Sequence, residues 1–77
     1  PSDGKDQERR RDINELVQFA LQQLRPEFRS VVVLRLVDGY STEETAKMLN
    51  IPVGTVLSRL ARGQKKMREL IKQVESL

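Results

Sequence analysis

The 77-residue sequence contains no cysteine and no histidine. Without them, disulfides, zinc-finger ligand spacings and the common nucleophile–histidine pairs are all excluded. There is also no apolar run long enough to span a bilayer, and no signal-peptide pattern. We therefore expect no metal site and no membrane association, and the absence of cysteine fits a cytosolic origin.

The chain is short enough to form one small domain, whose core would be too thin for a deep catalytic cleft. An enzyme of this composition would depend on carboxylates or lysine, and no paired arrangement of them stands out. We predict that the chain is not an enzyme and uses no cofactor or small-molecule substrate. It begins at Pro1 without an initiator methionine. We interpret it as a fragment of a longer protein or a processed chain.

Positive charge is concentrated at one end of the sequence. Residues 1–24 carry a formal charge of −1, residues 25–51 carry 0, and residues 52–77 carry +4. The overall charge of +3 is modest, but a surplus confined to one segment is what contact with DNA phosphates requires.

Residues 41–68 have the pattern of a helix-turn-helix, in which a short helix and a tight turn precede a longer, basic helix. Ser41 can cap the short helix, and Glu44 can complete a capping box. Ala46 and Leu49 share one face, where the small Ala46 permits close approach of the second helix. The turn follows directly, with Asn50 suited to a left-handed conformation, Ile51 between the helices and Pro52 pre-set for a helical start.

The second helix is predicted to begin near Val53 and to continue almost to the end of the chain. An apolar stripe recurs at spacings of three and four residues, at Val53, Val56, Leu57, Leu60, Met67, Leu70, Ile71 and Val74. Hydrogen-bond donors fall mainly on the other side, at Thr55, Ser58, Arg59, Arg62, Lys65 and Lys66. Arginine can bind guanine bidentately, while serine, threonine and lysine suit phosphate oxygens. A solvated surface is the alternative interpretation, and the helix-turn-helix pattern immediately upstream favours a DNA contact.

Two further helices are predicted upstream. The first should end near Arg25, because the residue before a proline disfavours the helical conformation. It is indicated by apolar residues at helical spacing, namely Ile13, Leu16, Val17, Ala20, Leu21 and Leu24. The second spans Pro26 to Asp38, with Gly39 as its C-terminal cap. Its β-branched run favours a strand by propensity, but its length and the lack of a partner strand favour a buried helix.

The start of the chain looks different. Pro1 to Arg11 is polar and charged, with no apolar residue beyond the proline. We predict a flexible linker over residues 1–11 and a folded domain over residues 12–77. The expected fold is all-α: a compact four-helix domain ending in a helix-turn-helix with a long C-terminal recognition helix.

The stretch from Leu24 to Ala46, together with Ile51 to Arg68, resembles region 4 of bacterial RNA polymerase sigma factors of the extracytoplasmic-function (ECF) group. The resemblance covers roughly Ile13 to Ile71, and its most specific part is Pro-Val-Gly-Thr-Val followed by Ser-Arg-Leu. It implies sequence-specific recognition of the promoter −35 element in duplex DNA, in the bacterial cytoplasm. It also implies docking on the β flap of RNA polymerase core and masking by an anti-sigma factor. Because region 2 is missing, this chain should bind DNA without initiating transcription.

By position, the resemblance implies that Ser58, Arg59 and Arg62 face DNA, flanked by Leu57 and Ala61. The full set of candidate DNA-binding residues is Thr42, Glu43, Thr55, Leu57, Ser58, Arg59, Ala61, Arg62, Lys65 and Lys66.

Three residues depart from the family pattern. Leu57 stands where the family usually carries lysine or arginine, so it either meets a thymine methyl or faces a partner protein. Asn50 replaces the usual turn glycine. Gly63 lies inside the long helix where alanine is common, which costs about 1 kcal/mol in helix propensity and would allow a bend.

Two other functions remain open at this point. The effector domain of a LuxR-type response regulator has a similar four-helix arrangement, although the Pro-Val-Gly-Thr-Val motif favours a sigma factor. The chain could also serve as a protein-interaction module gripped by an anti-sigma factor through the same surfaces.

Overall fold

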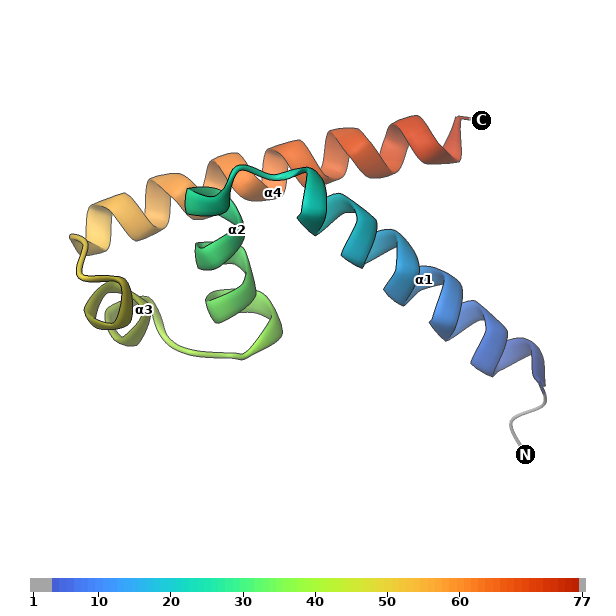
Figure 1. Cartoon of the computed structure of the whole chain (residues 1–77), viewed down its shortest axis with the longest axis horizontal. Helices are drawn as coiled ribbons and strands as arrows, with labels where there is room; N and C mark the ends of the chain where they lie inside the picture. Colours follow the sequence, from blue (N-terminus) through green and yellow to red (C-terminus); the bar gives the residue numbers. More distant parts are fainter. Residues whose placement is uncertain (1–3, 77) are drawn as a thin grey trace.

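The computed structural model describes the backbone of residues 4–76 and the side chains of residues 10–76. The described chain contains helices and no strand, which confirms the all-α fold. The elements are α1 (Gly4–Gln23), α2 (Pro26–Val32), a π-helical turn η1 (Val33–Val37), α3 (Thr42–Leu49) and α4 (Val53–Glu75). The long α4 runs along one side of the molecule, α2 and α3 pack beneath its first half, and α1 diverges from its second half (Figure 1).

The first helix starts earlier than the sequence suggested. Residues 4–11, predicted to be linker, are helical in the structure, whereas Pro1 to Asp3 lie outside the described residues. Within the described side chains of α1, only the C-terminal half packs into the core, through Ala20 and Leu21, and Leu24 directly after the helix is buried as well. Ile13, which has the same helical spacing, is 54% exposed because α1 and α4 diverge at this end. The role of residues 1–11 as a linker stays a prediction.

The corner between α1 and α2 is stabilised by an arginine. Pro26 occupies the first turn of α2, as predicted, after an extended Arg25. The guanidinium of Arg29 donates from Nε to the Leu21 carbonyl (3.1 Å) and from Nη2 to the Leu24 carbonyl (2.9 Å). The last carbonyls of a helix have no partner within it, so Arg29 caps α1 from the next helix.

The valine-rich segment is helical, as predicted from its length. Val31 and Val32 are buried, and the segment ends in the π-helical turn η1, where the Asp38 amide donates to the Val33 carbonyl. Gly39 follows with φ +81°, a left-handed conformation that glycine adopts without steric cost. The predicted glycine cap is therefore confirmed, and it turns the chain toward α3.

Two small apolar clusters form the core. One joins α1 to α2 through Leu21, Leu24 and Val32, and the other joins α2, α3 and α4 through Val31, Ala46 and Val56. Leu60 of α4 packs against both clusters. Because the second cluster draws one residue from each of three helices, α2 braces the helix-turn-helix from behind.

The contact between α2 and α4 depends on a glycine. Gly63 is buried in α4, and a Cβ built on it would lie 2.6 Å from the Val32 Cγ2 and 3.7 Å from the Phe28 carbonyl oxygen. Normal carbon–carbon contacts are about 3.5–4.0 Å, so alanine would not fit without displacing Val32. From the sequence alone, Gly63 was expected to lower the helix propensity of this segment. The structure shows that the close approach of α2 and α4 requires glycine at this position.

Candidate nucleic-acid interface

The helix-turn-helix begins with the predicted capping box. The Glu44 amide donates to the Ser41 hydroxyl oxygen (3.0 Å), and the Ser41 amide donates to the Glu44 carboxylate (2.8 Å). The backbone hydrogen bond from Ser41 lowers the pKa of Glu44 below its ordinary value of 4.5, with smaller contributions from the Ser41 hydroxyl and Lys47. The cap fixes where α3 starts, and therefore where Thr42 and Glu43 lie.

The turn between α3 and α4 also has the predicted geometry. Asn50 is left-handed, with φ 55° and ψ 50°, and the Ile51 amide donates to the Ala46 carbonyl (3.0 Å). Pro52 is the N-cap of α4 with φ −63°, and its carbonyl accepts from the amide of Val56 (3.1 Å). Ile51 packs against the cluster of Val31, Ala46 and Val56. The angle between the two helices is thus set by local turn geometry and by burial together.

Thr45, on α3, is buried although its side chain is polar. Its side chain is fully buried on α3, and its hydroxyl oxygen is buried without a hydrogen-bond partner among the described residues. A buried hydroxyl without a partner costs stability. No local pattern in the sequence points to Thr45 as a buried residue.

Eight of the ten candidate DNA-binding residues lie on α4 and two at the start of α3. Those on the exposed surface are Glu43, Leu57, Ser58, Ala61, Arg62, Lys65 and Lys66, and those half-buried are Thr42, Thr55 and Arg59. Since α-helical residues are spaced by about 100°, the side of α4 opposite the buried Val56 is centred on Ser58 and Lys65. Ala61 and Arg62 lie on either side of this line. Arg59 is turned toward the body of the domain, so it is placed less favourably than Arg62 for entering a groove.

The cations of this surface and the hydroxyl oxygen of Ser58 are available for a ligand. Ser58 donates its hydroxyl proton to the Thr55 carbonyl (3.1 Å), which leaves the oxygen lone pairs of Ser58 directed outward. Among residues 10–76, one ion pair is present, between Arg25 and Glu27 at 3.9 Å. Within the same residues, the cations of α4 form no ion pair with a carboxylate. We call this surface, made by Ser58, Arg62, Lys65 and Lys66, the donor face.

The donor face continues toward the corner between α1 and α2. Arg62 and Lys66 border a hollow of about 180 Å³, together with Gln23, Arg25 and Phe28. Arg25 comes from another element, so cations of two elements border one small depression. The sequence did not connect Arg25 with α4, because their proximity follows from packing.

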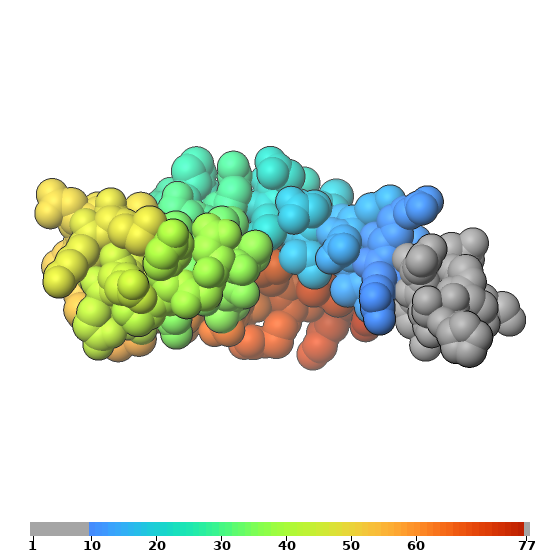
Figure 2. All heavy atoms as spheres, turned by 90° about the horizontal axis from the view of Figure 1, so that it is seen from below, coloured from blue at the N-terminus to red at the C-terminus, as the bar shows by residue number. Residues whose placement is uncertain are grey.

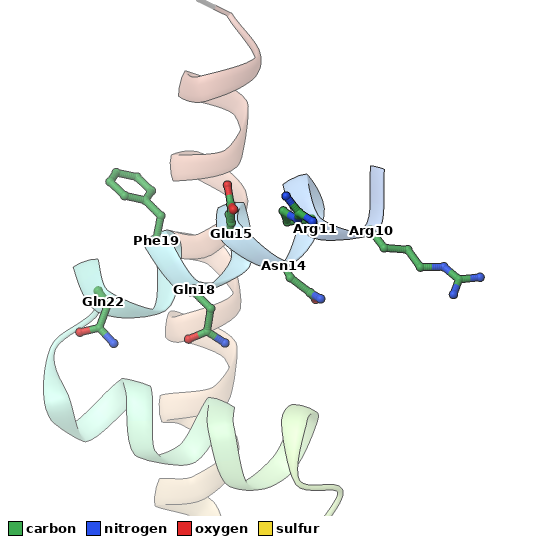
Figure 3. A pocket seen from close by; sticks show the side chains of 7 residues that line it. All are labelled: Arg10, Arg11, Asn14, Glu15, Gln18, Phe19 and Gln22. Carbon is green, nitrogen blue, oxygen red and sulfur yellow. The ribbon is translucent and has the colours of Figure 1, made fainter. Parts of the chain in front are cut away.

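Other surfaces lie apart from the donor face. The side chains of α3 and of the loop before it lie together at one end of the molecule, whereas α1 extends toward the other end (Figure 2). A shallow hollow of about 710 Å³ follows α1 and is lined by its side chains alone, with the ring of Phe19 standing out from the helix (Figure 3). No helix within residues 4–76 has the length and apolar character needed to cross a membrane.

The chain is similar to known transcription proteins over most of its length. Residues 14–67 match the family model described as sigma-70, region 4. The chain is 44% identical over 55 residues to the ECF RNA polymerase sigma factor SigE of Mycolicibacterium smegmatis, covering 71% of this chain and 21% of that protein. It is 33% identical over 63 residues to the ECF RNA polymerase sigma factor SigW of Bacillus subtilis, covering 82% and 34%. It is 45% identical over 56 residues to the RNA polymerase sigma factor CarQ of Myxococcus xanthus, covering 73% and 32%. The chain therefore spans about a fifth to a third of the length of these relatives.

Proposed function

Because the chain belongs to the sigma-70 region 4 family, in its ECF group, we propose that it recognises the −35 element of a promoter as part of a longer sigma factor. The observation that carries this proposal is the donor face, whose exposed arginine and lysines lie on the second helix of a braced helix-turn-helix and have no carboxylate partner among residues 10–76. In such motifs the second helix enters the major groove. The relatives described above are sigma factors, which leaves the response-regulator alternative without support.

The residues of the donor face would have different roles in DNA recognition. Arg62 is exposed near the centre of the outward side, where a guanidinium can reach guanine O6 and N7. The outward lone pairs of Ser58 suit an amino group of adenine or cytosine. Lys65 and Lys66 are phosphate ligands, which position the helix without selecting a sequence. We propose the half-buried Thr42, Thr55 and Arg59, with the exposed Glu43, as contacts along the backbone.

Affinity selection of random duplexes tests this function. The full-length parent protein, bound to core polymerase, should enrich one motif, and the same selection with an Arg62→Ala parent should lose part of it. Arg68→Ala is a matched control, because Arg68 is also an exposed arginine of α4 but lies outside the donor face. A wild-type parent that binds core polymerase and enriches no motif would contradict the proposal.

We further propose that the domain docks on the β flap of RNA polymerase in the bacterial cytoplasm, and that an anti-sigma factor masks it. Apolar side chains away from the donor face support this, since Phe19 on α1 is 49% exposed and Leu36 and Val37 on η1 are also exposed. A photo-crosslinking residue at position 19 should attach to the β subunit in the holoenzyme, and one at Lys65 should attach to promoter DNA. Equal crosslinking of both positions to DNA alone would rule out α1 as the docking surface.

A further inference from the structure

One flank of α4 carries an apolar strip beside the donor face. Val53, Leu57 and Ala61 follow one another at intervals of four residues, so their side chains lie in one row along the helix. Val53 is 41% exposed, Leu57 is 52% exposed, and Ala61 is exposed as well. We call this row the apolar ridge. It occupies about the first two and a half turns of α4, and the N-terminal part of this helix is the part that contacts base edges in a helix-turn-helix.

Leu57 and Ala61 do not belong to either core cluster of the described residues. Val53, in contrast, lines a hollow beside α3 together with Ala46 and Ile51. Single exposed apolar residues are common on protein surfaces and need no explanation. Here, however, Leu57 is 52% exposed and lies between two further apolar residues of the row, on the helix that the proposed function inserts into the groove.

The apolar ridge and the donor face are neighbours on the surface of α4. Leu57 and Ser58 are adjacent in sequence and therefore about 100° apart around the helix. Ala61 lies directly before Arg62, so its small side chain leaves room for α4 to approach the base edges. Leu57 and Arg62 are five residues apart, which places their side chains about 140° apart around the helix and about 7.5 Å apart along it, so they would reach different base pairs.

We propose that the apolar ridge, through Leu57, contacts the 5-methyl groups of thymines beside the bases recognised by the donor face. The thymine methyl is the apolar group that DNA displays in its major groove, and apolar side chains contact it directly. On this proposal, the promoter element of this protein contains a thymine at the base pair that Leu57 faces. This inference rests on the proposed DNA recognition and adds a sequence preference to it.

Replacement of thymine by deoxyuridine tests the inference, because it removes the methyl group and leaves base pairing intact. The duplex selected by the full-length parent with core polymerase is synthesised with one thymine replaced at a time. For the wild type, we expect one or two replacements to weaken binding about fourfold, the effect of removing one buried methyl group. For Leu57→Ala, the same replacements should have no effect.

Met48→Ala is the matched control. Met48 is 53% exposed on α3, so it presents a similar apolar surface outside the ridge, and its variant should keep the full response to deoxyuridine. A parent that selects a motif but tolerates methyl loss at every thymine overturns the inference and leaves the proposed function standing. A response that persists in Leu57→Ala also overturns it. A parent without any sequence preference overturns both. If Leu57→Ala weakens anti-sigma binding while the wild type ignores methyl loss, the ridge is a protein contact instead.

Discussion

Replacement of Gly63 by alanine should destabilise the domain, although alanine is the better helix former. In an exposed helix interior this exchange would add about 1 kcal/mol of stability. At this site the new Cβ would lie 2.6 Å from the Val32 Cγ2, about 1 Å closer than a normal contact. Val32 is 2% exposed, packs against Leu21 and Leu24, and is restricted to few rotamers by its branched Cβ. Overpacking of this kind costs about 1–3 kcal/mol, so we expect a net loss of about 1 kcal/mol.

Urea denaturation of the domain, with thermal unfolding as a second probe, measures the effect. A loss of 1 kcal/mol lowers the melting temperature of a domain of this size by about 4–8 °C. Gly54→Ala is the matched control, because no atom lies within 4 Å of its added Cβ, and it should be neutral or stabilising. Combining Gly63→Ala with Val32→Ala should recover the clash energy and give a favourable coupling of about 1 kcal/mol or more. If Gly63→Ala stabilises the domain as much as Gly54→Ala, the close packing of α2 on α4 is refuted.

Four further predictions follow from single contacts. Arg29→Ala should lower the free energy of unfolding by about 1–3 kcal/mol, since it removes two charge-assisted hydrogen bonds to the carbonyls at the end of α1. Arg29→Lys should not recover this stability, because lysine lacks the planar guanidinium that donates to both carbonyls at once. Thr45→Val should raise the free energy of unfolding by about 1 kcal/mol, because it removes a buried hydroxyl without a partner; a loss of stability would show that the hydroxyl is satisfied. The lowered pKa of Glu44 means that its contribution to stability is present above pH 4.5 and lost as pH falls through the folded-state pKa. Urea midpoints at neutral pH and well below 4.5 should therefore differ less in Glu44→Gln than in the wild type. Lys66→Ala should weaken binding to cognate and scrambled duplexes alike and reduce the slope of log K against log salt by about 1, whereas a selective loss on the cognate duplex would make Lys66 a base contact.

Local signals in the sequence were sufficient for the helix-turn-helix. The cap at Ser41, the left-handed Asn50 and the start of α4 after Pro52 each depend on residues within one turn of helix, and all three are confirmed. The helical state of the valine-rich segment was also predictable, because no other segment could pair with a strand. Its π-helical end at η1 left no recognisable signal in the sequence.

Features that depend on distant residues could not be predicted. The need for glycine at position 63 comes from Val32, and the cap on α1 comes from Arg29 on the next helix. The half-buried position of Arg59 depends on how α4 is rotated against the body, which helical spacing alone does not determine. The early start of α1 at Gly4 was missed because residues 4–11 carry no apolar face from which periodicity could be recognised.

The central claim is that the donor face of α4 selects a DNA sequence, and one ratio of affinities tests it most directly. The full-length parent with core polymerase is titrated with its selected duplex and with a scrambled duplex at the same salt concentration. For Arg62→Ala, we predict that affinity for the selected duplex falls by about 1–3 kcal/mol more than affinity for the scrambled duplex. For Arg68→Ala, both affinities should change equally. An equal loss on both duplexes for Arg62→Ala would contradict the account, because the donor face would then bind phosphates without recognising bases.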